Sequence, residues 1–218
     1  KELYVLTQGM WGTTGRYTKN WIRKTPAGCW GFFIYNQLTW NQNHRCKLTS
    51  AVTNQKTSID YGLIKLKEVN IRYFNEKPEL LKMGDNAEEA LIILSNAFGV
   101  SETTPVRVMP IFGINLVINI NLLPHIIEKR QNGRERFALF AQITLNQPYE
   151  VWQTLYDDGS YRYVYIGLFR ESKYHIAVVI SIFPDGHVLW NYMNGELRSI
   201  EKLRKGILQY SAESSAKK

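Results

Sequence analysis

One histidine of the chain is followed closely by three arginines. His125 precedes Arg130, Arg134 and Arg136. An imidazole has an ordinary pKa near neutrality and can both take up and release protons, and a guanidinium offers a two-pronged fork to phosphate oxygens. This combination predicts acid–base chemistry on a phosphate, with His125 and Arg134 as catalytic residues and Arg130 and Arg136 as substrate contacts. The alternative is that His125 only caps or packs a short helix.

Metal-independent RNA cleavage is a reaction that such side chains serve well. The ribose 2′-OH is the nucleophile, so the enzyme supplies a base for its proton, an acid for the leaving 5′-oxygen and cations for the charge on the phosphorus. The chain contains no P-loop and no GxGxxG motif, and no paired-carboxylate or Ser-His-Asp arrangement competes convincingly.

The other histidines carry weaker signals. His175 opens a predicted apolar strand and His187 follows a predicted turn, so we interpret both as structural residues at strand ends. His44 lies far from this region of the sequence.

Two of the arginines lie at the start of a predicted helix. There the unpaired backbone N–H groups already favour an anion, which would help Arg134 and Arg136 to bind phosphate. The alternative is a solvent-exposed helix face on which these arginines pair with Glu128 or Glu135.

The net charge of +8 is concentrated near the start of the chain. Residues 1–80 hold twelve Lys and Arg against five acids, an excess of seven. A basic surface of this kind attracts polyanions, so the charge favours a nucleic-acid partner. An anionic membrane surface and an acidic protein partner are the alternatives.

Cysteine usage and hydropathy narrow the class of protein. Two cysteines, Cys29 and Cys46, are too few for a disulfide framework, and we expect both to be reduced in a cytoplasmic protein. A zinc site of these two with His44 is the alternative, but the tight CxxC pair is absent, so we expect no metal and no cofactor. No run of eighteen apolar residues exists, so we expect no membrane-spanning helix. The chain begins without Met, and we expect it to be part of a longer protein.

The order of predicted elements indicates an α+β fold, with helices packed on a four-stranded antiparallel sheet. Helices are predicted at 85–98, 122–129 and 134–145, and four strands at 151–156, 161–169, 174–183 and 187–192. Short strands are predicted at 106–109 and 116–120, and a final amphipathic segment at 200–208.

A small β-rich segment is expected to precede this domain. It is basic and dense in aromatic residues, with strands predicted at 30–35 and 62–73. The predicted organisation is therefore residues 1–75 as this segment, 76–210 as the main domain and 211–218 as a tail.

The second half of the chain, from about residue 87 to 210, resembles the phage-encoded branch of the barnase, EndoU, colicin and RelE nucleases, known as PBECR. The resemblance rests on pieces in a fixed order. In that order they are Leu122-Leu123-Pro124-His125-Ile126-Ile127-Glu128-Lys129-Arg130, Arg134 with Arg136, Leu145-Asn146-Gln147-Pro148-Tyr149-Glu150-Val151-Trp152, Tyr165-Ile166-Gly167-Leu168-Phe169, Asp185-Gly186 with Asn191-Tyr192-Met193, and Leu203-Arg204-Lys205-Gly206-Ile207-Leu208-Gln209-Tyr210.

The resemblance implies a helix-covered four-stranded sheet that cleaves RNA without metal. Arg204 and Lys205 match the basic element of the family, which makes Arg204 a third catalytic residue on phosphate and Lys205 a substrate contact. Asn191 and Tyr192 are predicted to orient the substrate, whereas Trp152 is predicted to anchor the core.

Taken together, the sequence predicts a metal-independent endoribonuclease, a toxin or phage effector that leaves a 2′,3′-cyclic phosphate. Its expected partners are RNA, with tRNA as one candidate, and an immunity or antitoxin protein. We expect it to act in the cytoplasm of a target or host cell, delivered as part of a larger protein. The alternative is a module that binds nucleic acid or protein without turnover.

Overall fold

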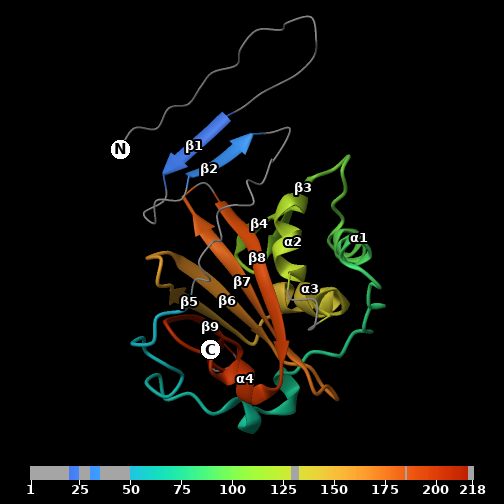
Figure 1. The fold of residues 1–218 in the computed structure, drawn as a ribbon. Coiled ribbons are helices and arrows are strands. Elements are labelled where there is room, and N and C mark those ends of the chain that lie inside the picture. The colour runs from blue at the N-terminus through green and yellow to red at the C-terminus, as the bar shows by residue number, and fades with distance from the viewer. Residues whose placement is uncertain (1–19, 25–29, 35–49, 129–132, 185, 216–218) are drawn as a thin grey trace, which may run out of the picture. The chain divides into compact units, whose positions relative to one another are not determined.

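The computed structural model describes residues 20–24, 30–34, 50–128, 133–184 and 186–215 (Figure 1). The chain divides into two compact units, Lys1–Lys47 and Leu48–Lys218. In the first unit, β1 (Asn20–Lys24) pairs antiparallel with β2 (Trp30–Ile34). β2 corresponds to the strand predicted at 30–35. Cys29, His44 and Cys46 lie outside the described residues.

The four predicted strands form the centre of a sheet in the second unit. They are β5 (Glu150–Leu155), β6 (Tyr161–Gly167), β7 (His175–Phe183) and β8 (Gly186–Gly195), each antiparallel to the next. The β5–β6 hairpin turns at Asp158, whose carboxylate accepts from the Ser160 backbone N–H at 2.9 Å. Such an Asx turn, followed by Gly159 at a φ of 76°, reverses the chain within a few residues.

The prediction of a four-stranded sheet was wrong, because this sheet has seven strands in the order β3-β4-β8-β7-β6-β5-β9. A hairpin of β3 (Val106–Ile111) and β4 (Ile114–Asn119) joins β8 through a short parallel pairing, and β9 (Ile207–Ser211) pairs antiparallel with β5. Edge pairings of this kind join residues far apart along the chain, which hydrophobic periodicity does not reveal.

The predicted helices are present. Asn86 caps α1 (Ala87–Phe98) by accepting from the Glu89 N–H, and Gly99 ends it at a φ of 67°. A short 3₁₀ turn, η3 (Ile120–Leu122), leads into α2 (Leu123–Ile127), which carries its proline in the first turn. The helix predicted at 134–145 begins as a 3₁₀ turn, η5 (Arg134–Phe137), and continues as α3 (Ala138–Asn146). None of the described helices is long and apolar enough to cross a bilayer.

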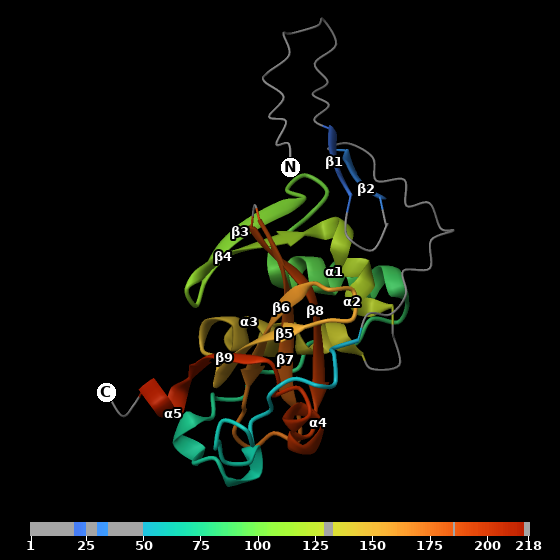
Figure 2. The same cartoon turned by 90° about the vertical axis from the view of Figure 1, so that its left-hand side faces the viewer.

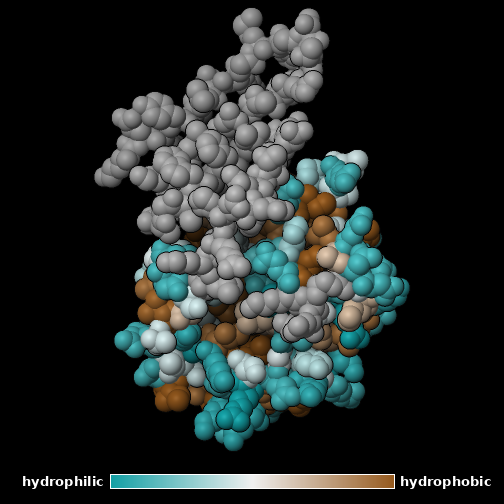
Figure 3. Space-filling model, in the orientation of Figure 1, coloured by the Kyte–Doolittle hydropathy of each residue, from teal (hydrophilic) through white to brown (hydrophobic). Residues whose placement is uncertain are grey.

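Two apolar clusters lie on opposite faces of the sheet. Helices α1, α2 and α3 cover one face over alternate residues such as Val178, Ile180 and Tyr192. The other face packs Trp152 and Val164 against residues 61–74 and α4 (Leu197–Glu201). Figure 2 shows α4 and this wrapping segment grouped together, away from α1, α2 and α3. The described surface in Figure 3 intersperses hydrophobic with hydrophilic residues.

The segment predicted as a strand at 62–73 is instead two 3₁₀ turns, η1 (Leu66–Glu68) and η2 (Ile71–Tyr73). Its buried side chains, Leu66 and Val69, are three residues apart, a helical spacing rather than an alternating one. The described residues 50–75 are part of the larger unit, Leu48–Lys218.

The end of the domain also differs from the predicted amphipathic segment at 200–208. Helix α4 ends at Glu201, and Gly206 adopts a φ of 110° where an added Cβ would collide with the Gln153 carbonyl. This glycine lets β9 approach β5 closely. The last described helix, α5, spans Ala212–Ser215, within the predicted tail.

Candidate active site

A buried arginine of η5 lies beside β8. Arg134 follows Gly133, which adopts a φ of 49°, and is 8 % exposed. Its Nη1 donates to the Asn191 side-chain oxygen at 2.8 Å and to the Ile126 carbonyl at 3.3 Å. Burial lowers the pKa of this guanidinium, a shift that Tyr192 and Glu128 oppose.

The Nε atom of Arg134 is buried and has no hydrogen-bond partner among the described residues. A buried N–H without an acceptor is costly. With Nη1 already held by two oxygens, Nε is the N–H of this guanidinium for which the described residues supply no acceptor.

His125 lies in the same neighbourhood. The side chain is 30 % exposed, and its Nδ1 is 3.2 Å from the Glu128 carboxylate in the next turn. Its ring centroid is 4.9 Å from that of Trp190 on β8. Trp190 is followed by Asn191, whose side-chain oxygen accepts from Arg134. Arg134 also donates to the carbonyl of Ile126, the residue after His125. His125 and Arg134 are therefore linked through Trp190 and Asn191, and we call these four residues the contact circuit.

A second guanidinium that sequence analysis missed approaches this circuit from the middle of the sheet. Arg162 on β6 lies 4.1 Å from the ring centre of Tyr156 and 5.3 Å from that of Trp190, and it pairs with Asp158 at 3.0 Å. Its position could have been noticed, because it is the one charged residue of β6.

Two further predicted substrate contacts are not exposed at this circuit. Tyr192 is fully buried on the helix-covered face, where burial raises the pKa of its phenol, and its O–H donates to the Arg134 carbonyl at 2.8 Å. Arg136 donates from Nε to the Leu81 carbonyl at 3.4 Å. Tyr192 therefore holds the backbone of Arg134 from the core side. The Arg136 side chain points toward the segment that precedes α1, around Leu81. Arg130 lies outside the described residues.

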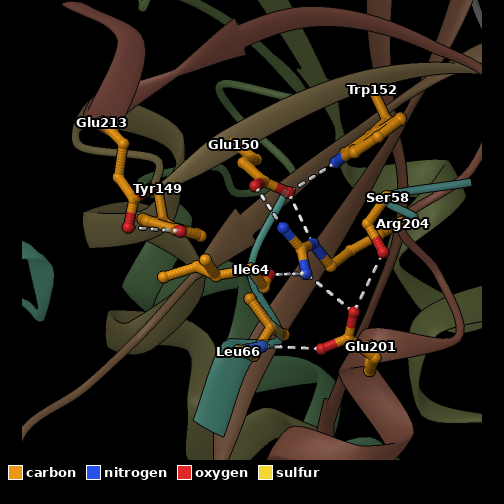
Figure 4. Close-up of polar contacts among 9 residues, drawn as sticks. All are labelled: Ser58, Ile64, Leu66, Tyr149, Glu150, Trp152, Glu201, Arg204 and Glu213. Atoms are coloured by element: carbon orange, nitrogen blue, oxygen red, sulfur yellow. Dashed lines mark hydrogen bonds and ion pairs between the residues drawn. The ribbon is translucent and has the colours of Figure 1, made fainter. Parts of the chain in front are cut away.

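Arg204 contacts β5, which β6 and β7 separate from β8, the strand that His125 contacts. Its guanidinium is fully buried and makes two hydrogen bonds to Glu150 on β5, at 2.8 and 2.6 Å (Figure 4). It also donates to Glu201 and to the Ile64 carbonyl. Burial alone would lower its pKa, but the bonds and charges of Glu150 and Glu201 outweigh burial and hold that pKa above its ordinary value. This arginine is occupied as a structural cation and does not join His125 and Arg134.

The neighbours of Arg204 have structural contacts as well. The Lys205 carbonyl accepts from the Thr154 hydroxyl at 2.7 Å, and its Nζ lies 3.4 Å from the Ala51 carbonyl. Trp152 is fully buried, as predicted, and its indole N–H donates to Glu150.

Residues 94–211, more than half of the chain, match the family described as phage-Barnase-EndoU-ColicinE5/D-RelE like nuclease2, or PBECR2. The chain belongs to the PBECR2 family. Membership makes it a nuclease of the barnase, EndoU, colicin and RelE type, with nucleic acid as its substrate. No curated protein and no solved structure matched the chain.

The PBECR2 match includes the whole contact circuit of His125, Trp190, Asn191 and Arg134. It also includes two histidines that have structural neighbours. The His187 ring stacks on Tyr163 at 5.7 Å. His175 is 4 % exposed, accepts from the Phe169 N–H at 3.1 Å and lies edge-on to Phe74.

Because burial lowers the pKa of His175 to about 4, the PBECR2 domain should lose stability in acid. The unfolded chain binds this proton at higher pH than the folded one does, so the contribution is complete above pH 6.5 and is lost as pH falls toward 4. The loss amounts to about 3 kcal/mol. Urea unfolding of the wild type and of His175→Asn, which keeps an acceptor for Phe169, measures it: the wild type should show the steeper pH dependence. Equal slopes would contradict the assignment.

Proposed function

We propose that this chain is a metal-independent endoribonuclease that cleaves RNA by attack of the 2′-OH. The observation that supports this is the contact circuit that joins His125 to the anchored Arg134 through Trp190 and Asn191. In this proposal His125 transfers the proton and Arg134 binds the phosphate, and the family match supports nuclease chemistry.

In the proposed reaction the groups have separate tasks. Glu128 faces Nδ1 of His125, which favours a proton on that nitrogen and makes Nε2 the basic one. Nε2 takes the proton of the 2′-OH as the bond from the 2′-oxygen to phosphorus forms. The bond from phosphorus to the 5′-oxygen breaks, and a solvent proton neutralises that oxygen. The products are a 2′,3′-cyclic phosphate and a 5′-OH.

Arg134 is proposed to hold the phosphate while charge builds up on its oxygens. Its Nη1 is fixed by two acceptors, so the guanidinium is already oriented before substrate binds. Preoriented donors of this kind are among the strongest contributors to catalysis. Tyr192 and Asn191 support that orientation rather than contacting substrate themselves.

Arg134→Lys is expected to lower kcat by about 10²-fold, because lysine keeps the charge but lacks the fork that binds two oxygens. Steady-state cleavage of a labelled oligoribonucleotide gives kcat, and circular dichroism confirms the fold. Arg198→Lys changes an exposed position of α4 in the same way. It is the matched control and should leave kcat unchanged. A rate within twofold of wild type in Arg134→Lys would remove Arg134 from the reaction.

The biological setting is proposed on the same basis. We propose a toxin or phage effector that acts on cellular RNA, with tRNA as a candidate, in the cytoplasm of a target or host cell. An immunity or antitoxin protein would restrain it. The excess of basic residues in the first third of the chain supports attraction to a polyanion.

Incubation of the purified chain with total RNA in EDTA tests the activity. Cleavage that leaves 2′,3′-cyclic phosphate and 5′-OH ends supports the proposal. RNA that is bound tightly but stays intact would instead support a nucleic-acid-binding module, and cleavage that EDTA abolishes would exclude the metal-independent reaction.

A further inference from the structure

Strand β8 contains an irregularity at the candidate site. Asn191 pairs with Val179 and Leu189 pairs with Ile180, so Trp190 is an extra residue with no partner of its own on β7. This is a β-bulge, a feature that changes the direction in which side chains point and often lies next to active sites.

The bulge changes which residues of β8 share a face. Leu189 and Tyr192 both pack into the helix-covered core, although they are three residues apart. In a regular strand two residues separated by three positions point to opposite faces. The extra residue therefore allows two consecutive side chains, those of Trp190 and Asn191, to serve the site while both flanking residues stay in the core.

Each of these two side chains contacts a different part of the candidate machinery. Asn191 holds Arg134. The indole of Trp190 lies 4.9 Å from the His125 ring and 5.3 Å from the Arg162 guanidinium, measured to ring centroids. His125 and Arg162 come from α2 and β6, so Trp190 is the contact they have in common.

Among the described residues, few other contacts constrain the His125 side chain. Helix α2 has five residues, and the Glu128 partner of His125 has a side chain that is 57 % exposed. Ion pairs this exposed hold side chains only weakly. The indole, in contrast, projects from a strand that is paired with β7 on both sides of the bulge, so the sheet fixes the backbone that carries it.

We infer that Trp190 is a positioning residue, and that the bulge in β8 exists to place its indole between α2 and Arg162 so that the His125 imidazole is held in its reactive orientation. This rests on the proposed ribonuclease function. Trp190 acts through His125 and therefore affects kcat rather than the binding of RNA.

The test compares Trp190→Leu and Trp190→Phe with a matched control, Tyr163→Leu. Tyr163 also stacks on a histidine, His187, but on the opposite face of the same sheet. Trp190→Leu is expected to lower kcat by about 30-fold, since small misplacements of catalytic groups cost up to about 100-fold, with KM nearly unchanged. Trp190→Phe should recover most of that loss, and Tyr163→Leu should leave kcat as it was.

A second readout separates this inference from the function on which it rests. In NMR spectra, the His125 ring protons of the wild type should be shifted by the indole ring current and show one orientation. Trp190→Leu should show several orientations, whereas Tyr163→Leu should not. This result supports positioning even if no RNA is cleaved, which would refute the ribonuclease proposal alone. A single unchanged His125 orientation in Trp190→Leu, or a higher KM with unchanged kcat, would overturn the inference.

Discussion

His125→Ala is expected to slow RNA cleavage by about 10³-fold, within the range that general acid–base groups contribute. The 2′-OH is then deprotonated by water alone, while Arg134 and its anchors still hold the phosphate. Initial rates in EDTA with an oligoribonucleotide measure the effect, and KM should change little because the imidazole acts on a proton rather than on binding.

His187→Ala is the control for this variant. It removes another partly exposed histidine that contacts an aromatic ring, here Tyr163. Its rate should match that of the wild type once the folded fraction is equal. Rapid cleavage by His125→Ala would show that another group is the base. The contacts between His125 and Arg134 would then have a structural role and not a catalytic one.

Arg204→Met is expected to destabilise the folded chain by about 3–5 kcal/mol, because it leaves the buried Glu150 carboxylate without its cation. Glu150 and Arg204 both have fully buried side chains, and they share two hydrogen bonds. Native domains are stable by only about 5–15 kcal/mol, so this single change removes much of the total. Urea unfolding followed by circular dichroism gives the free energy.

The double variant Arg204→Met with Glu150→Gln is the informative control. It removes both charges together, and the Trp152 indole can still donate to the Gln side-chain oxygen. We expect it to be more stable than Arg204→Met alone. The folded fraction of either variant should cleave RNA at the wild-type rate. A stable Arg204→Met that has lost cleavage would instead restore the sequence-based role of Arg204 on phosphate.

The contrast between Arg134 and Arg204 shows what sequence could and could not predict. Both are arginines in short basic motifs, and both were predicted to bind phosphate. The acceptors that distinguish them, Asn191 for Arg134 and Glu150 for Arg204, are 57 and 54 residues away. The sequence predicts an arginine's chemistry, but its partner is decided by strand pairing between distant segments.

Local signals were reliable where the cause of the structure is local. The helix predicted at 85–98 is present, and its Asn86 cap and its Gly99 end each depend on contacts within a few residues. The bulge at Trp190 was not predictable, because nothing in the residues around it shows that the alternation of faces is interrupted there. The charge of Arg162 on β6 was a visible signal, but its contact with Trp190, two strands away on β8, was not predictable.

The most direct measurement of the central claim uses one oligoribonucleotide that the chain cleaves and a second copy carrying a single 2′-deoxy nucleotide on the 5′ side of the cut. With His125 taking a proton from the 2′-OH, the ribonucleotide is cut in EDTA to a 2′,3′-cyclic phosphate and the deoxy-substituted copy stays intact at that position. Cleavage of both at comparable rates would contradict the account, because the proposed nucleophile is missing from the second.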